Sequence, residues 1–431
     1  MLKFLKFFIF IITLNSMNLN VYADSVNVTA DSAILIEVKT GKILYEKNIS
    51  KKQYPASITK IMTALLALEN NDFSETLTFS QNAIYGIEPG SSHIARKVGE
   101  EITLEQALNA LLLESANEVA NGIAEHVDSS IEEFAKHMTR RAEELGAKNT
   151  NFVNPHGLPD KNHYTTALDM ALIAREAIKY EDFRKIISTI QYTIPPTNKN
   201  SSEYILTNQH RMLKNKRYSS KYFYAGCEGG KSGYTDVARH TLVTYAKRDN
   251  TELISVVLKS EKATLYSDTI KLFDYGFNNF QLVELAKKEN VFSTVNVFSK
   301  GISTSENADV KIGSLQLINT TDLSCIIDNS IPISEIDQEL VVPTLYTPVF
   351  KDDIVGELKY TYNGTLIGSI PLKASKSYQK VNSSVNESFN VITKNKLNNN
   401  IKDSNFLLYG LIIIILILLV FILKKLKRKI R

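Results

Sequence analysis

One serine and one lysine have the types and the spacing needed for chemistry at a hydroxyl. They belong to the run Ser57-Ile58-Thr59-Lys60. Residues i and i+3 share one face of a helix, so the Ser57 hydroxyl and the Lys60 amine would lie side by side. Ser57 would also lie at a helix N-terminus, where free N–H groups and the positive end of the helix dipole favour negative charge. The arrangement suits a reaction that develops negative charge beside the hydroxyl.

A second Ser-x-x-Lys pattern, from Ser377 to Lys380, has the same spacing in a different setting. It lies in a stretch rich in Ser, Asn and Lys, where apolar neighbours that could bury or position the lysine are scarce. The setting therefore favours Ser57 and Lys60.

A polar pair, Ser115 and Asn117, follows the strongly apolar run Ala107–Leu113. That run predicts a buried helix, so the pair could present polar groups at the edge of a core. The pattern Ser-x-Asn is common in this chain, and a solvated helix end would explain it equally well; other copies begin at Ser16, Ser25, Ser80, Ser305 and Ser384.

A third motif places a cation beside a hydroxyl and a glycine. Lys231-Ser232-Gly233 lies between Gly229-Gly230 and the strand pattern that follows Tyr234. Gly233 would let a ligand approach the backbone closely, and the lysine with the hydroxyl suits a carboxylate. Lys39-Thr40-Gly41 has the same shape but lies at the predicted turn of a hairpin, so we interpret it as turn chemistry.

The elements that must position these motifs alternate between strand and helix patterns. Residues 33–47 predict a β-hairpin, and Pro55 precedes a helix predicted over 57–69. Further helices are predicted over 103–127, 131–145, 166–179 and 265–279, and buried strands over 240–247 and 252–258. This order predicts a sheet covered by helices.

The chain changes character after this region. Residues 284–373 show short apolar runs separated by Gly, Asn, Asp and Pro, which predict a small all-β domain. Residues 374–405 predict a flexible stalk, which as a coil would hold the β domain about 30 Å from a membrane.

Both ends of the chain predict targeting segments. Residues 1–23 have two lysines, an apolar run and a small-residue cleavage site, as a secretory signal peptide does; three asparagines in the segment disfavour the alternative of an uncleaved anchor. Residues 406–423 are uncharged and would form about 27 Å of helix, which predicts a transmembrane helix better than a buried core helix. Residues 424–431 are a basic tail, which the positive-inside rule places in the cytoplasm. The segment 24–405 is then external.

Composition excludes several classes of protein. The chain has 431 residues, 44% hydrophobic and 22% charged, as in a globular protein of more than one unit. The net charge of +4 comes from the two termini, so the external part is net acidic and lacks the basic surface that nucleic-acid binding needs. Two cysteines and seven scattered histidines predict no disulfide framework, no metal site and no cofactor.

The three motifs, in this order and in an exported chain, are the signature shared by penicillin-binding proteins and class A β-lactamases. Over residues 27–280 the chain resembles the low-molecular-mass, serine-type D-alanyl-D-alanine carboxypeptidases. The likeness implies an α/β (α+β) serine β-lactamase/penicillin-binding-protein-like domain over 24–280, with an antiparallel sheet flanked by helices. It rests on Tyr54–Ala64, Leu111–Ala120, Asn151–Leu158, His163–Ala167 and Gly229–Thr235.

The resemblance implies the site. Ser57 would be the nucleophile on peptidoglycan stem peptides ending in D-Ala-D-Ala, and Lys60 would be its base. By the same resemblance Ser115 would relay a proton and Asn117 would help to hold the substrate. Lys231 and Ser232 would hold the terminal carboxylate, and Gly233 and Tyr234 would also belong to the substrate-binding site. The N–H groups of Ser57 and Tyr234 would form the oxyanion hole. β-Lactams would acylate Ser57.

Three positions depart from the family pattern. Ser232 stands where the family commonly has threonine, Ala238-Arg239-His240 replaces a usual Ala-Gly, and Leu265 stands where we align a frequent arginine. Two alternatives to the carboxypeptidase also remain. A class A β-lactamase would need a Glu-x-x-Leu-Asn segment that we do not find between Asn117 and Lys231, and a membrane-tethered wall-binding scaffold would have a degenerate site.

Overall fold

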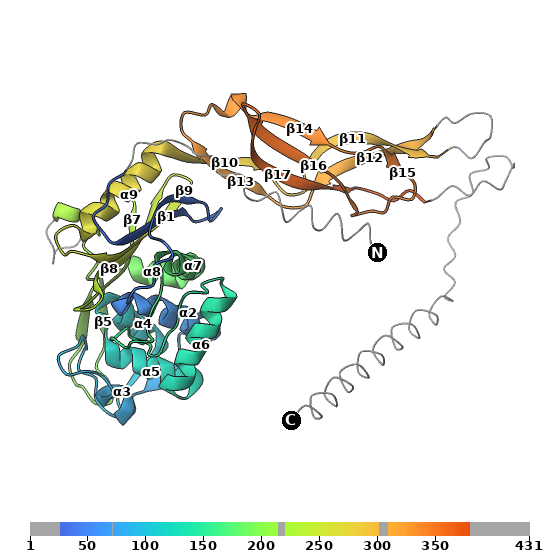
Figure 1. Cartoon of the computed structure of the whole chain (residues 1–431). Helices are drawn as coiled ribbons and strands as arrows, with labels where there is room; N and C mark the ends of the chain where they lie inside the picture. The colour runs from blue at the N-terminus through green and yellow to red at the C-terminus, as the bar shows by residue number, and fades with distance from the viewer. Residues whose placement is uncertain (1–25, 71, 214–219, 301–308, 380–431) are drawn as a thin grey trace, which may run out of the picture. The chain divides into compact units, whose positions relative to one another are not determined.

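The computed structural model describes residues 26–70, 72–213, 220–300 and 309–379 (Figure 1). The predicted signal peptide over 1–23 and transmembrane helix over 406–423 lie outside these residues, as does the basic tail. Within the described ranges, no helix is both long and apolar enough to cross a bilayer.

A five-stranded antiparallel sheet forms the centre of the first half, in the order β2-β1-β9-β8-β7. Successive residues of β1 pack into different cores: Ile34 and Ile36 into one, Ala33 and Leu35 into the other. A strand buried on both faces needs this apolar run, because its side chains alternate between the faces. The strands are β1 (Ser32–Glu37), β2 (Ile43–Lys47), β7 (Cys227–Thr235), β8 (Arg239–Arg248) and β9 (Thr251–Ser260).

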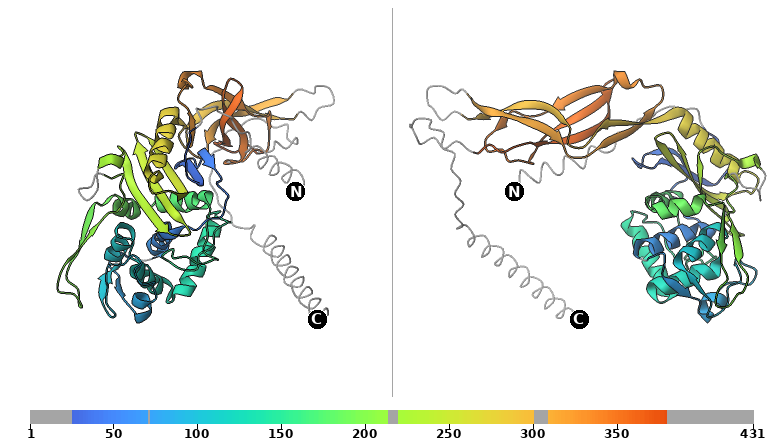
Figure 2. Two further views of the ribbon diagram at one scale, coloured as in Figure 1. Left: turned by 60° about the vertical axis from the view of Figure 1, so that its left-hand side comes forward. Right: turned by 180° about the vertical axis from the view of Figure 1, so that it is seen from behind.

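Helices cover both faces of this sheet, as predicted. Helix α9 (Leu265–Asn279) lies on one face, and α7 (Ala167–Ala177) and α8 (Glu181–Ser188) on the other, with the remaining helices beyond them (Figures 1 and 2). The predicted hairpin, the strands β8 and β9 and the helix over 265–279 are confirmed.

The helical part surrounds α2 (Lys60–Asn70), which the short 3₁₀ turn η1 (Ala56–Thr59) introduces. Its other helices are α3 (Gln81–Tyr85), α4 (Leu104–Leu113), α5 (Asn117–Asp128) and α6 (Ile131–Glu144). The Thr103 side chain accepts from the Gln106 N–H and the Gln106 side chain accepts from the Thr103 N–H, which fixes the start of α4. The buried side chains of these helices form one core with the sheet.

Two sequence expectations were wrong in this part. The single helix predicted over 103–127 is the short strand β4 (Glu101–Thr103) followed by α4 and α5, with a break at 114–116. Lys231-Ser232-Gly233 lies inside β7 and not before a strand. The sequence reading also missed helix α8 and three short strands: β3 (Thr76–Thr78), β5 (Gln191–Ile194) and β6 (Tyr204–Thr207).

The second half is all-β apart from the 3₁₀ turn η3 (Ile333–Glu335), as predicted. Strand β10 (Phe280–Ala286) pairs with β13 (Leu323–Asp328), and the other strands form a six-stranded sheet in the order β14-β16-β17-β12-β11-β15. Asn363 and Gly364, both at positive φ, make the tight β16–β17 turn. The six strands are β11 (Val291–Ser299), β12 (Val310–Asn319), β14 (Asp337–Val341), β15 (Leu345–Tyr346), β16 (Ile354–Tyr362) and β17 (Thr365–Ala374).

Candidate active site

Lys60 contacts polar groups from the first two motifs and from a loop outside the three motifs. Its Nζ is 3.1 Å from Ser57 Oγ, 2.6 Å from Asn117 Oδ1 and 2.8 Å from the carbonyl oxygen of His156. The Lys60 side chain is fully buried, whereas Ser57 is partly exposed. Ser57 thus presents its hydroxyl at the surface while the amine is held behind it.

The partners of Lys60 define what its amine can do. Asn117 Oδ1 and the His156 carbonyl can only accept hydrogen bonds, so they take two N–H groups. A neutral amine has no third N–H, and its lone pair then faces the Ser57 hydroxyl. Burial, together with the charge of Lys231, holds the pKa of Lys60 well below its usual range, against the opposing effect of Glu118. A neutral Lys60 amine held in this way could accept the Ser57 proton.

Ser115 lies at the break between α4 and α5. Its φ is +63°, a conformation that non-glycine residues rarely adopt, and it ends α4 so that α5 can begin at Asn117. The Ser115 side chain is buried, and its Oγ has no hydrogen-bond partner among the described residues. A strained residue with an unpartnered hydroxyl is often part of a functional site.

Lys231 is a second buried lysine, and its charge affects the pKa of Lys60. Its Nζ donates to the backbone carbonyl of Ser232 at 2.9 Å, and only 3% of the residue is exposed. Burial lowers the pKa of Lys231 to about 7, although Glu114 opposes the shift. A charged Lys231 has three N–H donors, and the Ser232 carbonyl takes one of them, so the others can bind a ligand.

A close approach of backbones joins β7 to the turn that carries Ser57. A Cβ on Gly233 would lie 2.6 Å from the Ser57 nitrogen, and on the neighbouring strand β8 Thr241 Oγ1 donates to the Pro55 carbonyl at 2.8 Å. Glycine is the residue that permits this contact. Tyr234 follows at the edge strand, half exposed, with its ring centroid 4.5 Å from that of His240.

Sequence reasoning assigned no role to the loop 153–163, which supplies the His156 carbonyl. Gly157, at φ +92°, lies so close to the Ala56 carbonyl that a Cβ there would be 1.9 Å from its oxygen. The runs Asn151–Leu158 and His163–Ala167 contributed to the family resemblance. A contact made by a backbone carbonyl leaves no signal in a side-chain pattern.

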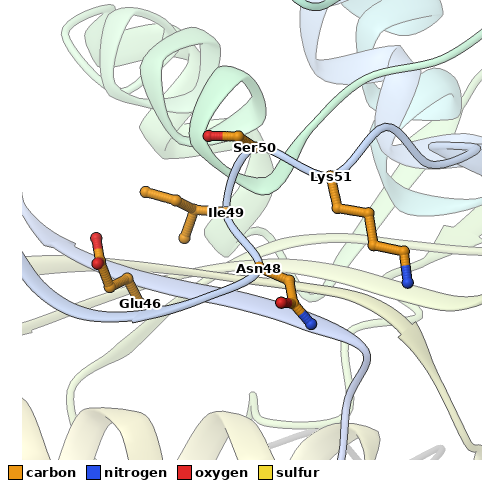
Figure 3. Close-up of a pocket in the computed structure, with 5 residues that line it drawn as sticks. All are labelled: Glu46, Asn48, Ile49, Ser50 and Lys51. Carbon is orange, nitrogen blue, oxygen red and sulfur yellow. The ribbon is translucent and has the colours of Figure 1, made fainter.

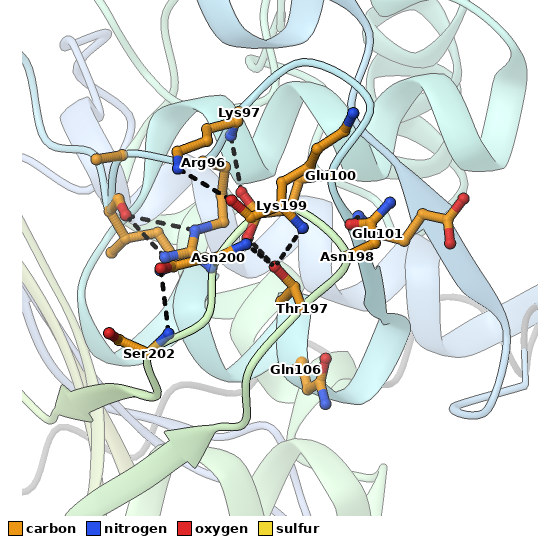
Figure 4. A network of polar contacts seen from close by, with 12 residues as sticks. Arg96, Lys97, Glu100, Glu101, Gln106, Thr197, Asn198, Lys199, Asn200 and Ser202 are labelled. Carbon is orange, nitrogen blue, oxygen red and sulfur yellow. Dashed lines mark hydrogen bonds and ion pairs between the residues drawn. The ribbon is translucent and has the colours of Figure 1, made fainter.

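A polar network beside the site ties two loops together (Figure 4). Arg96 and Glu100 form a buried ion pair at 2.9 Å, and Glu100 also accepts from the Thr197 hydroxyl at 2.7 Å. Glu118, next to Asn117, accepts from the Ile94 N–H at 2.7 Å. The network therefore fixes the loop 94–101 against both α5 and the β5–β6 hairpin.

The positions that depart from the family pattern have structural consequences. Arg239 adopts φ +54° at the β7–β8 turn and pairs with Glu261 at 2.9 Å. Leu265 is buried in the apolar cluster under α9.

A surface hollow of about 340 Å³ contains none of the motif residues. It is lined by Glu46, Asn48, Ile49, Ser50 and Lys51 (Figure 3).

Comparisons with known proteins identify the family of the chain. The family model for D-alanyl-D-alanine carboxypeptidase matches residues 19–262, and that for the C-terminal domain of penicillin-binding protein 5 matches 280–380. The chain is 32% identical to D-alanyl-D-alanine carboxypeptidase DacF of Bacillus subtilis, over 81% of this chain and 86% of that protein. It is 28% identical to D-alanyl-D-alanine carboxypeptidase DacC of Escherichia coli, over 80% and 83%.

A solved structure shares the architecture. Penicillin-binding protein 5 of Haemophilus influenzae superposes with a TM-score of 0.71 at 26% identity, covering 83% of this chain and all of that one. Fold, motif geometry and family models point the same way: the chain belongs to the D-alanyl-D-alanine carboxypeptidase family of low-molecular-mass penicillin-binding proteins.

Proposed function

We propose that this protein is a serine-type D-alanyl-D-alanine carboxypeptidase that removes the terminal D-alanine from peptidoglycan stem peptides. One observation carries the proposal: the buried Lys60 amine is held by two acceptors with its third direction toward Ser57 Oγ. This arrangement activates a serine without a histidine. The β-lactamase and scaffold alternatives gain no support from the relatives, which are carboxypeptidases.

The reaction follows from the roles of these groups. Ser57 Oγ attacks the carbonyl carbon between the two D-alanines, and its proton passes to Lys60 Nζ. The C–N bond breaks as Ser115 relays a proton to the leaving amine, which departs as D-alanine. The remaining ester on Ser57 is hydrolysed by water, which restores the free hydroxyl. Penicillin would form the same ester and block the site.

Substrate binding is assigned to β7 and Asn117. The Lys231 cation and the Ser232 hydroxyl would hold the terminal carboxylate, and Gly233 would let the substrate lie close to the strand. The N–H groups of Ser57 and Tyr234 would bind the oxyanion, a device in which losing one donor costs about 10²–10³ in rate.

We infer that the enzyme works on the outer face of a bacterial membrane. Residues 1–23 would be the signal peptide, 24–280 the catalytic domain, 284–373 the β domain and 374–405 the stalk. Residues 406–423 would form the single transmembrane helix, with 424–431 in the cytoplasm. The uncharged run and its basic flank support this topology.

An acid and an amide substrate test the exopeptidase function. If Lys231 and Ser232 bind a free carboxylate, amidation of the D-Ala-D-Ala terminus should remove a charge-assisted hydrogen bond worth about 1.5–3 kcal/mol. The expected loss in kcat/KM is then roughly 10- to 150-fold. Lys231→Ala should lower kcat/KM for the acid by a similar factor. The same substitution should change kcat/KM for the amide little. Equal hydrolysis of acid and amide by the wild type would contradict the proposal and indicate an endopeptidase.

A further inference from the structure

A histidine outside the three motifs contacts the turn that carries Ser57 and Lys60. His163 Nε2 lies 2.9 Å from Oγ1 of Thr59, which stands between the two catalytic residues on η1. His163 is 1% exposed and Thr59 is fully buried, so water cannot readily replace either partner. This ring is therefore a fixed part of the wall behind the nucleophile.

The second ring nitrogen determines which atom donates. The Val153 N–H donates to His163 Nδ1 at 3.1 Å, so Nδ1 carries no proton. Burial lowers the pKa of His163 to about 4, with Asp160 opposing and Lys60 adding to the shift, so the ring is neutral at neutral pH. Its single proton is then on Nε2, which donates to Thr59 Oγ1.

The loop that carries His163 contacts both sides of the turn. It supplies the His156 carbonyl to Lys60 and places Gly157 against the Ala56 carbonyl. The Asn154 side chain stiffens the loop by accepting from the Gly157 N–H at 2.7 Å and donating to the Leu158 carbonyl at 3.0 Å. Because these contacts hold the loop in place, the His163 ring can in turn hold η1 in place through Thr59.

We propose that His163 is a positioning residue for catalysis, whose Nε2–H bond to Thr59 Oγ1 fixes the turn on which Ser57 and Lys60 lie. The inference rests on the proposed role of Ser57 as nucleophile. It predicts that the donor to Thr59, and not the ring itself, sustains the rate of acylation. Small displacements of reacting groups are costly, because a shift of 1 Å can slow a reaction about 10²-fold.

Two amide variants separate the donor from the ring. His163→Gln places an N–H near the Nε2 position and keeps the bond to Thr59. His163→Asn places an oxygen near the Nδ1 position and keeps only the acceptor for Val153. Both lose the edge contact with Phe152, whose ring centroid is 5.5 Å away, so their unfolding temperatures should fall alike. The rate constant for acylation of the full chain by benzylpenicillin should stay within about threefold of wild type for Gln and fall about 10- to 100-fold for Asn.

Thr59→Val provides the partner test with an isosteric side chain. It should slow acylation as much as His163→Asn, and the double variant should be no slower than either single one, because both remove the same bond. Equal rates in the Gln and Asn variants, a wild-type rate for Thr59→Val, or multiplying effects in the double variant would overturn the proposal. If His163→Gln does not fold, the Thr59→Val rate decides alone. A wild-type chain that forms no adduct on Ser57 would instead overturn the proposed function.

Discussion

The proposed mechanism needs the two buried lysines in different charge states. Lys60 must be neutral to accept the Ser57 proton, and Lys231 must be charged to bind a carboxylate. Burial lowers the pKa of both, and the Lys231 cation lowers that of Lys60 further. Both pKa shifts favour the neutral amine, and the charge of Lys231 adds to the shift at Lys60.

Burial lowers the pKa of Lys231 to about 7, which predicts that activity falls on the alkaline side, or limb, of the pH–rate profile. Deprotonation removes the cation as pH rises, so kcat/KM for a D-Ala-D-Ala acid should fall above about pH 7, approaching tenfold per pH unit. Lys231→Arg keeps a charge at all these pH values and should move the limb to higher pH. A limb that stays in place in Lys231→Arg would show that another group titrates.

Side-chain motifs of the site were predictable from the sequence, and backbone contacts were not. Ser57 and Lys60 at helical spacing, and Lys231 beside Ser232, carry their chemistry in their side chains. The His156 carbonyl and the proton on His163 depend on a loop fold that no residue type encodes. Ser377, which the sequence placed in the stalk, lies instead in the β part, where its hydroxyl accepts from the Lys351 N–H.

At the scale of elements, the sequence predictions failed where a helix breaks and where two backbone segments approach closely. The periodicity over 103–127 continues across Ser115 because α4 and α5 bury their apolar faces in one core. The first helix ends where Ser115 adopts a positive φ, which its residue type does not predict. In β7, glycines replace the branched residues that indicate a strand, because neighbouring backbone leaves no room for a Cβ.

The contact between β7 and η1 predicts that Gly233→Ala inactivates a folded enzyme. The new Cβ would lie 2.6 Å from the Ser57 nitrogen and 3.0 Å from the Ala56 Cβ, so the strand and the turn must separate. We expect acylation to slow at least about 10²-fold. Gly364→Ala is the control, since its Cβ would meet nothing within 4 Å. It should destabilise its turn but leave acylation of the folded protein unchanged; equal acylation by both variants would contradict the argument.

The β7–β8 turn predicts a stabilising substitution. Arg239 holds φ +54°, which costs a non-glycine residue about 1–2 kcal/mol, whereas its pair with Glu261 is exposed and adds little stability. Arg239→Gly should therefore have a higher free energy of unfolding than Arg239→Ala, by about 1 kcal/mol. Both variants lose the ion pair, and only glycine relieves the backbone strain. Equal stability of the two variants would show that the turn is unstrained.

At the scale of the whole molecule, the sequence predicted a helical catalytic part and an all-β part, and the structure has both. Their order agrees with the two family models. Tyr378 pairs with Val349, and its hydroxyl donates to the Ser314 carbonyl at 2.8 Å, so the chain is packed on the β sheet to this point. The stalk predicted over 374–405 would therefore begin after Tyr378, and the proposed membrane helix would follow it.

This layout predicts where protease should release the enzyme. Trypsin treatment of wall-stripped cells should cut within 380–405, where lysines are frequent, and release an active soluble fragment. The fragment mass and its D-alanine release would be measured. If added trypsin instead cleaves the basic tail and leaves residues 26–379 intact, the orientation in the membrane is opposite to the one proposed. That result would exclude a wall substrate.

The mass of the intact protein after treatment with benzylpenicillin tests the central claim, an acyl-enzyme on Ser57, most directly. Wild type and the control Ser377→Ala should gain one long-lived adduct, and Ser57→Ala none. Lys60→Arg, which keeps a cation but cannot serve as the base, should be labelled far more slowly. Rapid loss of the adduct would indicate a β-lactamase. An adduct on Ser57→Ala, or an unlabelled wild type, would contradict the account.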